Sequence, residues 1–131
     1  MLLFTTVVHY EVLRLLARWL PVLAIPARAR LIVVIFAVFI AHLVEIALYA
    51  CAIFLFVRYP EIGSLEGSNH PSLARCLYFS AETYSSLGYG DVAPSGEIRL
   101  LAGMEVLNGL LLIGWSASYT YISMERFWKD D

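Results

Sequence analysis

The groups best suited to chemistry in this chain belong to the backbone, in the stretch S-S-L-G-Y-G-D at positions 85–91. Gly88 and Gly90 adopt positive φ angles at little cost, so a strip that alternates them with Leu87 and Tyr89 can point successive carbonyl oxygens to one side. Such a row is a ligand set for a hard monovalent cation. Because one strip surrounds an ion from one side only, we expect several copies of the chain to assemble around an axis.

Side-chain chemistry of other kinds is not apparent. The side chains of Ser86, Leu87 and Tyr89 do not form a catalytic set of nucleophile, base and orienting group, because no histidine or acid lies nearby except Glu82 and Asp91. We therefore expect no enzyme and no cofactor. The net charge of −2 and the lack of a lysine cluster argue against a nucleic acid partner. With 60% hydrophobic and 15% charged residues, the composition instead favours membrane lipid as the surroundings.

Two long apolar runs are predicted to cross the membrane. Residues 31–57 carry only His42 and Glu45 as charged or imidazole side chains, and residues 98–124 carry only Arg99 and Glu105 as charged ones. At 1.5 Å per residue, the first run spans about 40 Å, enough to cross a bilayer with tilt. Basic residues flank the two runs at the chain ends, which places both termini in the cytoplasm and the connection outside. These residues are Arg14, Arg18, Arg28, Arg30, Arg126 and Lys129.

The connection has two parts. Residues 58–71 are rich in Gly, Ser, Pro and Asn and are predicted to form an outer loop. Residues 72–85 contain no Gly or Pro and favour a helix capped by Ser72, which is too short to cross a bilayer. This helix must enter the membrane and turn back, and residues 86–91 follow it. Non-helical backbone survives at that depth only when protein buries it or water wets it.

The N-terminal segment 1–30 allows two interpretations. Glu11, Arg14 and Arg18 form one charged stripe on an otherwise apolar helix, which Pro21 and Pro26 would end. We expect an interfacial helix on the cytoplasmic face, followed by a linker. The alternative is a short third spanning helix, which would place the N-terminus outside.

Residues 80–91, S-A-E-T-Y-S-S-L-G-Y-G-D, resemble the pore helix and the T-V-G-Y-G-D selectivity filter of potassium channels. The similarity extends to the aromatic pair Tyr78 and Phe79, to Pro94 after the filter, and to inner-helix glycines at Gly109 and Gly114. It implies a potassium channel of all-α fold in the cell membrane, assembled as a homotetramer. The pore domain would comprise residues 31–124, with outer helix 31–57, outer loop 58–71, pore helix 72–85, filter 86–91 and inner helix 98–124, before a short tail, 125–131.

The resemblance also implies residue roles. Potassium would be bound by the carbonyls of Ser86, Leu87, Gly88 and Tyr89 and by the Ser86 hydroxyl, with Gly90 leading to the outer mouth. Glu82 and Asp91 would brace the filter from behind, close enough to share a proton, and Tyr78 and Phe79 would pack around it. Gly109 would be the hinge of the inner helix. Cavity-lining positions would fall on Leu110, Ile113, Ala117 and Tyr121.

Two filter residues depart from the family pattern. Ser86 replaces Thr and keeps the hydroxyl but loses a methyl group, and Leu87 replaces Val. We expect potassium selectivity to survive, because carbonyl geometry makes the cage. A weakly selective cation channel and a non-conducting membrane subunit stay as alternatives.

Polar residues inside the spans predict a seam between the two helices. His42, Glu45 and Tyr49 share one face of the outer helix at i, i+3 and i+7. Glu105, Asn108 and Ser116 lie on the inner-helix side away from the cavity. We expect Glu45 to hydrogen-bond Asn108 or Tyr49, with Glu105 near enough to share protons. Independent structural hydrogen bonds are the alternative, and His42 is interpreted as a packing residue because no second metal ligand stands at i+4.

Overall fold

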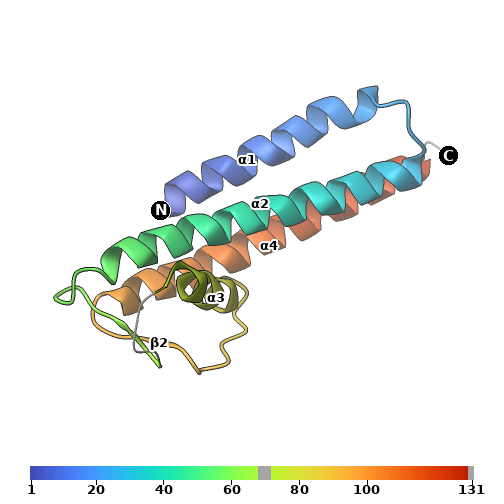
Figure 1. Ribbon diagram of the computed structural model, residues 1–131. Coiled ribbons are helices and arrows are strands. Elements are labelled where there is room, and N and C mark those ends of the chain that lie inside the picture. The colour runs from blue at the N-terminus through green and yellow to red at the C-terminus, as the bar shows by residue number, and fades with distance from the viewer. Residues whose placement is uncertain (68–71, 130–131) are drawn as a thin grey trace.

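The structure, a computed structural model, describes residues 1–67 and 72–129 of the 131-residue chain. The described part is mainly helical and contains one small antiparallel pair of strands (Figure 1). Its elements are α1 (Leu2–Trp19), the 3-10 turn η1 (Leu20–Val22), α2 (Ala27–Phe56), β1 (Leu65–Glu66), α3 (Leu73–Tyr84), β2 (Ala93–Pro94) and α4 (Ile98–Lys129).

The two longest helices, α2 and α4, lie side by side along their length (Figure 1). Both are long and apolar enough to cross a membrane, over Ala27–Phe56 and Ile98–Trp128. Large hydrophobic side chains such as Phe36, Phe39 and Leu111 point outward from them, as expected of helices that face lipid or other protein. The predicted all-α fold with two such helices is confirmed.

Both helices are longer than predicted. Helix α2 begins directly after Pro26, four residues before the predicted start at 31, because a proline fits just ahead of a helix. Helix α4 continues through Arg126 to Lys129, so most of the predicted tail 125–131 belongs to the inner helix. No Gly or Pro interrupts the chain there, and Phe127 is buried between α1 and α2.

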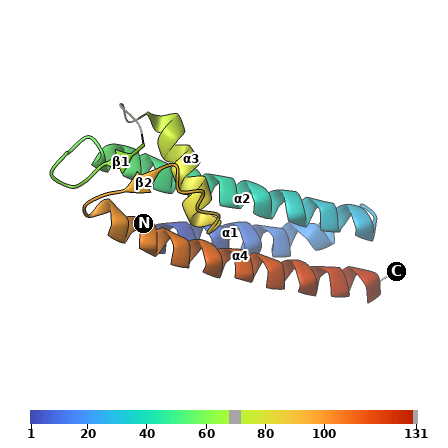
Figure 2. The ribbon, with the colours of Figure 1, turned by 90° about the horizontal axis from the view of Figure 1, so that it is seen from below.

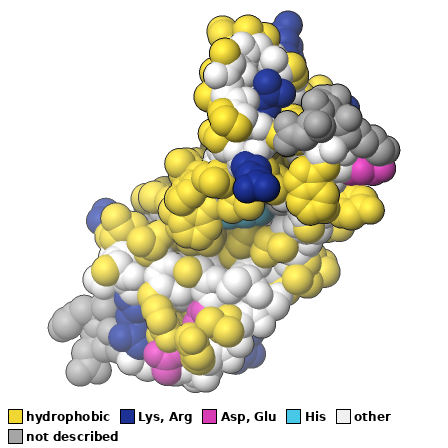
Figure 3. Space-filling view, turned by 90° about the vertical axis from the view of Figure 1, so that its right-hand side faces the viewer, with side chains coloured by type: hydrophobic (Ala, Val, Ile, Leu, Met, Phe, Trp, Pro, Cys, Tyr) yellow, Lys and Arg dark blue, Asp and Glu magenta, His cyan; other side chains and the backbone are white. Residues whose placement is uncertain are grey.

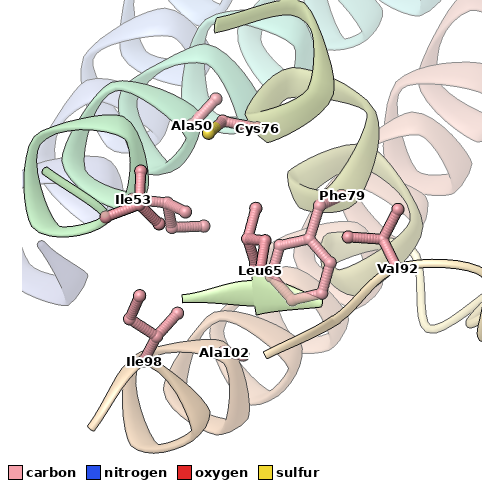
Figure 4. Packing of buried hydrophobic residues seen from close by; sticks show 9 residues of the cluster. Ala50, Ile53, Leu65, Cys76, Phe79, Val92, Ile98 and Ala102 are labelled. Carbon is pink, nitrogen blue, oxygen red and sulfur yellow. The ribbon is translucent and has the colours of Figure 1, made fainter. Parts of the chain in front are cut away.

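The short helix α3 begins where the sequence predicted. Ser72 caps it, because the Arg75 backbone N–H donates to the Ser72 side-chain oxygen at 3.2 Å. The helix runs across the long helices rather than along them (Figure 2). It is held by a hydrophobic cluster at this end of the bundle (Figure 4), whose members are Ala50, Ile53, Val57, Leu65, Cys76, Phe79, Val92, Ile98 and Ala102.

A two-stranded pair closes the same end. β1 lies inside the predicted outer loop and pairs antiparallel with β2, placing Leu65 opposite Pro94 and Glu66 opposite Ala93. Leu65 and Val92 turn their side chains into the cluster beside Phe79 (Figure 4). The loop that precedes α3 is thereby tied to the segment that follows residues 86–91, so both ends of that segment are fixed to one core.

Helix α1 lies lengthwise against α2 and α4 (Figures 1 and 2). Its buried face consists of Thr5, His9, Leu13 and Leu16, at helical spacing. The charged stripe points away from this face, and its Arg14 guanidinium donates to the Glu11 carboxylate at 3.0 Å on the surface. The helix is therefore amphipathic, and its inward face includes two polar residues as well as leucines.

This packing differs from the expected position of segment 1–30 on the cytoplasmic face. Residues near the start of α1 contact side chains midway along α2 and α4, so α1 runs with the two long helices instead of below them. It is not among the described helices that are long and apolar enough to span a membrane. The N-terminus lies toward the α3 end of the bundle and the C-terminus at the other end (Figure 1).

Candidate functional site

Residues 86–90 have an alternating backbone. The φ angles of Ser86, Gly88 and Gly90 are +59°, +55° and +82°, whereas those of Leu87 and Tyr89 are not positive. Alternation of left-handed and right-handed conformations directs successive carbonyl oxygens to the same side of a strip. All five residues are exposed in the single chain. The strip therefore has the geometry of a row of carbonyl ligands that can contact an ion from one side only.

Glu82 holds this strip from behind with both its backbone and its side chain. The Leu87 N–H donates to the Glu82 carbonyl oxygen at 2.8 Å, and the Tyr89 N–H donates to Oε2 of the Glu82 carboxylate at 3.2 Å. Glu82 itself is buried in the last turns of α3. The Gly88 N–H also donates to the Glu82 carbonyl oxygen, at 3.4 Å. A buried residue that accepts amide hydrogens from three successive residues fixes which way the strip faces.

Asp91 has a different partner from the one predicted. The Tyr78 hydroxyl donates to the Asp91 carboxylate at 3.1 Å, and no hydrogen bond joins Glu82 to Asp91 in the part of the chain that the structure describes. The expected shared proton between these two acids is therefore not supported. Each acid instead receives its own donor. Phe79 is buried in the hydrophobic cluster that holds α3, while Tyr78 is exposed.

The predicted cavity-lining residues share one exposed face of α4, which carries Leu110, Ile113, Ala117 and Tyr121. Ile113, Ala117 and Tyr121 border an open hollow of about 640 Å³ between α4 and α2. Gly109, by contrast, is buried. A Cβ atom there would come within 2.2 Å of the Tyr84 carbonyl oxygen, so α4 can approach the end of α3 only because this residue is glycine. The predicted hinge thus has a packing role as well.

The predicted polar seam exists, with different partners. The Asn108 amide donates to the Tyr49 hydroxyl at 3.2 Å and to Thr5 Oγ1 at 2.6 Å. Glu45 bonds neither Asn108 nor Tyr49, and it is not joined to Glu105 in the described residues. Sequence reasoning missed Thr5, because nothing in its local pattern showed that α1 would pack against α4.

Glu45 lies at the centre of a buried cluster drawn from four helices. His9 Nδ1 lies 2.8 Å from Glu45 Oε1, His42 Nδ1 lies 3.1 Å from Oε2, and the Tyr84 hydroxyl donates to Oε2. Ser116 Oγ lies 3.0 Å from His9 Nε2 and 3.1 Å from His42 Nε2. Three donors to one buried carboxylate are the arrangement that an ionised glutamate requires.

Glu105 is buried in a separate environment. The Ser80 hydroxyl contacts both Glu105 Oε1 and the Ile46 carbonyl oxygen, but it has only one hydrogen to donate. Both contacts are satisfied when Glu105 carries a proton and donates it to Ser80 Oγ. Glu105 Oε2 has no partner among the described residues, which also suits a neutral acid. The surroundings of Glu45 therefore suit an ionised carboxylate, and those of Glu105 suit a neutral acid.

His9 was the main residue that sequence reasoning missed. It stands in an apolar helix four residues after Thr5 and four before Leu13, so all three lie on one face. The helical spacing of these residues could have indicated that Thr5 and His9 are buried with Leu13, because the charged residues of the helix lie on a different face. It could not have indicated the partners, since His9 meets Glu45 and Ser116 at separations of 36 and 107 residues.

Comparison with known proteins finds one family model, described as an ion channel, that matches residues 29–126. The match covers about three quarters of the chain and includes α2, α3, residues 86–90 and nearly all of α4. Searches of curated proteins and of solved structures find no match.

Proposed function

Because this chain belongs to the ion channel family, we propose that four copies form a pore selective for potassium, with residues 86–90 as its selectivity filter. Ions would pass down their electrochemical gradient through rings of carbonyl oxygens from Ser86, Leu87, Gly88 and Tyr89. The observation that carries the proposal is the alternation of φ at residues 86–90, together with the Glu82 side chain that fixes the strip. Gly90 is the last residue of this alternation.

The exposure of the strip supports an oligomer. One chain offers carbonyls from one side only, and a potassium ion that sheds its water needs oxygens all round. Apolar side chains cover much of the remaining surface (Figure 3), including Leu107, Leu110 and Leu111 on α4. A fourfold ring would bury the exposed face of α4 around the axis and leave α2 toward lipid. The hollow beside Ile113 would open toward the neighbouring copies.

Helix α3 supports the choice of a cation. Its C-terminal end leads straight into the strip, and the C-terminus of a helix carries partial negative charge. In a ring, several such ends would point toward one axis and favour a cation beneath the filter. The cell membrane is the proposed location, with the C-terminal end of α4 in the cytoplasm, where Arg126 follows the positive-inside rule.

Ser86 and Leu87 motivate the alternative, a weakly selective monovalent cation pore. Serine lacks the β-methyl group of threonine, which restricts rotation about χ1. The Ser86 hydroxyl would therefore be a less rigidly held ligand at the innermost ion site. The same fold serves both functions, and the reversal potential separates them.

The test is the reversal potential of the purified protein in planar bilayers, with potassium on one side and sodium on the other. A reversal close to the potassium equilibrium potential is expected. A reversal near zero with robust current would favour the weakly selective pore. The oligomeric state of the same preparation is measured in parallel. A monomer without current, or a stable tetramer that remains silent under both ion gradients and at both polarities, would overturn the proposal in favour of a non-conducting subunit.

A further inference from the structure

Three side chains in the buried cluster bring metal-binding atoms together. His9, His42 and Glu45 each offer one ligand atom, and these atoms lie within 4.8 Å of one another. Two imidazole nitrogens and one carboxylate oxygen form a donor set that Zn²⁺ and neighbouring transition metals prefer. At metal–ligand distances of about 2.0–2.1 Å, adjacent tetrahedral ligands lie about 3.3 Å apart. His9 Nδ1 lies 2.8 Å from Glu45 Oε1 and His42 Nδ1 lies 3.1 Å from Oε2, so each imidazole already lies beside one oxygen of the same carboxylate. The three residues must draw together from separations of up to 4.8 Å to hold one ion.

Ser116 supplies the outer support that metal-binding histidines require. A histidine that binds a metal through Nδ1 carries its hydrogen on Nε2 and donates it to a nearby acceptor. Ser116 Oγ lies 3.0 Å and 3.1 Å from the two Nε2 atoms and has two lone pairs, one for each. Without an ion, the single Ser116 hydrogen can serve only one of two neutral imidazoles that donate from Nδ1. When both Nδ1 atoms are metal ligands, Ser116 Oγ accepts a hydrogen from each Nε2 atom.

Tyr84 supports the third ligand in the same way. Its hydroxyl donates to Glu45 Oε2, which leaves Oε1 free to face an ion beside His9. Hydrogen bonds of this kind orient a carboxylate and keep it ionised. The Tyr84 oxygen also lies 2.9 Å from His42 Nδ1, so the ring of polar groups is closed on the α3 side. A fourth coordination position would be left for water.

An ion has an access route. His9 and Glu45 are fully buried, but His42 is partly exposed and borders, with Ser116, the open hollow between α2 and α4. A small histidine surface is visible among hydrophobic side chains in the space-filling view (Figure 3).

We propose that His9, His42 and Glu45 bind one divalent transition metal ion of the Zn²⁺ type in each chain. The ion ties α1 to α2 directly, and through Tyr84 and Ser116 it touches α3 and α4. Tyr84 is the last residue of α3, two positions before the filter strip, so the occupied site stiffens the base of that strip. The inference does not depend on which ion the pore conducts.

The test is Zn²⁺ binding to the full-length purified oligomer, measured by competition with a chromophoric chelator. The background carries His70→Ala, which removes the third histidine of the chain. We expect one ion per chain, and at least about 100-fold weaker binding after His9→Gln. Glutamine keeps a hydrogen bond to Glu45 within reach but is a poor transition-metal ligand. Ser116→Ala keeps all three ligands and should weaken binding by about 10- to 100-fold, through the lost acceptor.

Glu105→Gln is the matched control, because it replaces a buried acid of the same bundle that has no hydrogen bond to any of the three ligands among the described residues. It should leave Zn²⁺ affinity unchanged. Co²⁺ serves as a second probe, since visible absorption of a four-coordinate Co²⁺ complex reports the ligand geometry without reference to current. His42→Gln provides an independent ligand variant if His9→Gln does not assemble. Equal Zn²⁺ affinity of the parent and both histidine variants, or no Zn²⁺ binding by the assembled parent, would overturn the inference while leaving the proposed pore intact.

Discussion

The filter strip and the Glu45 cluster lie close together at the α3 end of the bundle, yet they are built in opposite ways. Residues 86–90 present backbone oxygens, are exposed, and are contiguous in sequence. The cluster uses side chains, is almost fully buried, and draws its members from α1, α2, α3 and α4. The strip is incomplete in one chain, whereas the polar groups of the cluster contact one another within it. Helix α3 joins the two, with Glu82 bonded to the strip and Tyr84 to the cluster.

A backbone site needs only local conformation, which two glycines and a preceding helix can specify. A side-chain site in the membrane needs long-range packing, because each buried polar group must meet a partner to offset its desolvation. Substitutions that disfavour the required φ angles should therefore impair the strip. Substitutions that remove single hydrogen bonds should impair the cluster.

The largest expected effect is Gly88→Ala in the strip. Gly88 has φ of +55°, and a Cβ atom there meets nothing within 4 Å in the single chain. An L-residue in this conformation costs about 1–2 kcal/mol, so the strip should leave its alternating form and potassium current should fall at least about tenfold, while assembly persists. Bilayer recordings on size-checked oligomer measure this. Gly103→Ala, a glycine of α4 with equally open space, is the control and should conduct like the parent.

Gly109→Ala should affect the strip and the cluster together. The added Cβ would overlap the Tyr84 carbonyl oxygen, which α4 helps to hold in place. We expect the free energy of unfolding to fall by about 1–3 kcal/mol, as for other overpacked sites, and the current to fall with it. Chemical unfolding in detergent measures the free energy of unfolding, and bilayer recordings measure the current. Gly114→Ala is the control, because that position is open and alanine favours a helix. A change in channel opening with unaltered stability would instead favour a pure hinge at Gly109.

Thr5→Val should weaken the contact between α1 and α4 and spare the strip. Valine has a similar shape but cannot accept the hydrogen of the Asn108 amide. A loss of about 1 kcal/mol in the free energy of unfolding is expected, with faster amide exchange in α1 and unchanged selectivity. Thr6→Val is the matched control, since the Thr6 hydroxyl donates to the Leu2 carbonyl of its own helix. Equal losses from both variants would contradict a specific contact between Thr5 and Asn108.

The smallest effect is expected for Glu105→Gln. If Glu105 is neutral and donates to Ser80, the glutamine amide can donate in its place, and the free energy of unfolding should change by less than about 0.5 kcal/mol. Glu45→Gln removes a carboxylate that accepts from three donors and should cost more, about 1–3 kcal/mol. Chemical unfolding of the two variants side by side gives the difference. A larger loss from Glu105→Gln than from Glu45→Gln would show that the assigned protonation states are reversed.

Several predictions from the sequence agree with the structure because their causes are local. The run after Pro26 is long and apolar, so it forms α2, and Ser72 caps α3 as its side chain predicts. The positive φ of Gly88 and Gly90 follows from the absence of a Cβ. Ser86 also adopts a positive φ, which the sequence did not indicate, since serine rarely does so without support from its surroundings.

Other features depended on how the helices packed. The partners predicted for Glu45 were wrong, because the choice among Asn108, Tyr49 and His9 depends on where α1 lies. Asp91 was paired with Glu82 by resemblance but bonds Tyr78, whose hydroxyl is the donor within reach. Gly109 was interpreted as a hinge, and only its distance to the Tyr84 carbonyl oxygen showed the close approach of α4 to α3.

The amino-acid sequence by itself determined two apolar helices, a short capped helix between them and a strip of backbone able to alternate, because hydropathy, capping and glycine act over a few residues. Only the tertiary structure decided that α1 lies along the bundle and that His9 meets His42, Glu45 and Ser116. The physical reason is that apolar helices pack in many ways with similar burial of hydrophobic surface. Buried polar side chains select among those ways, since each of them must find a partner.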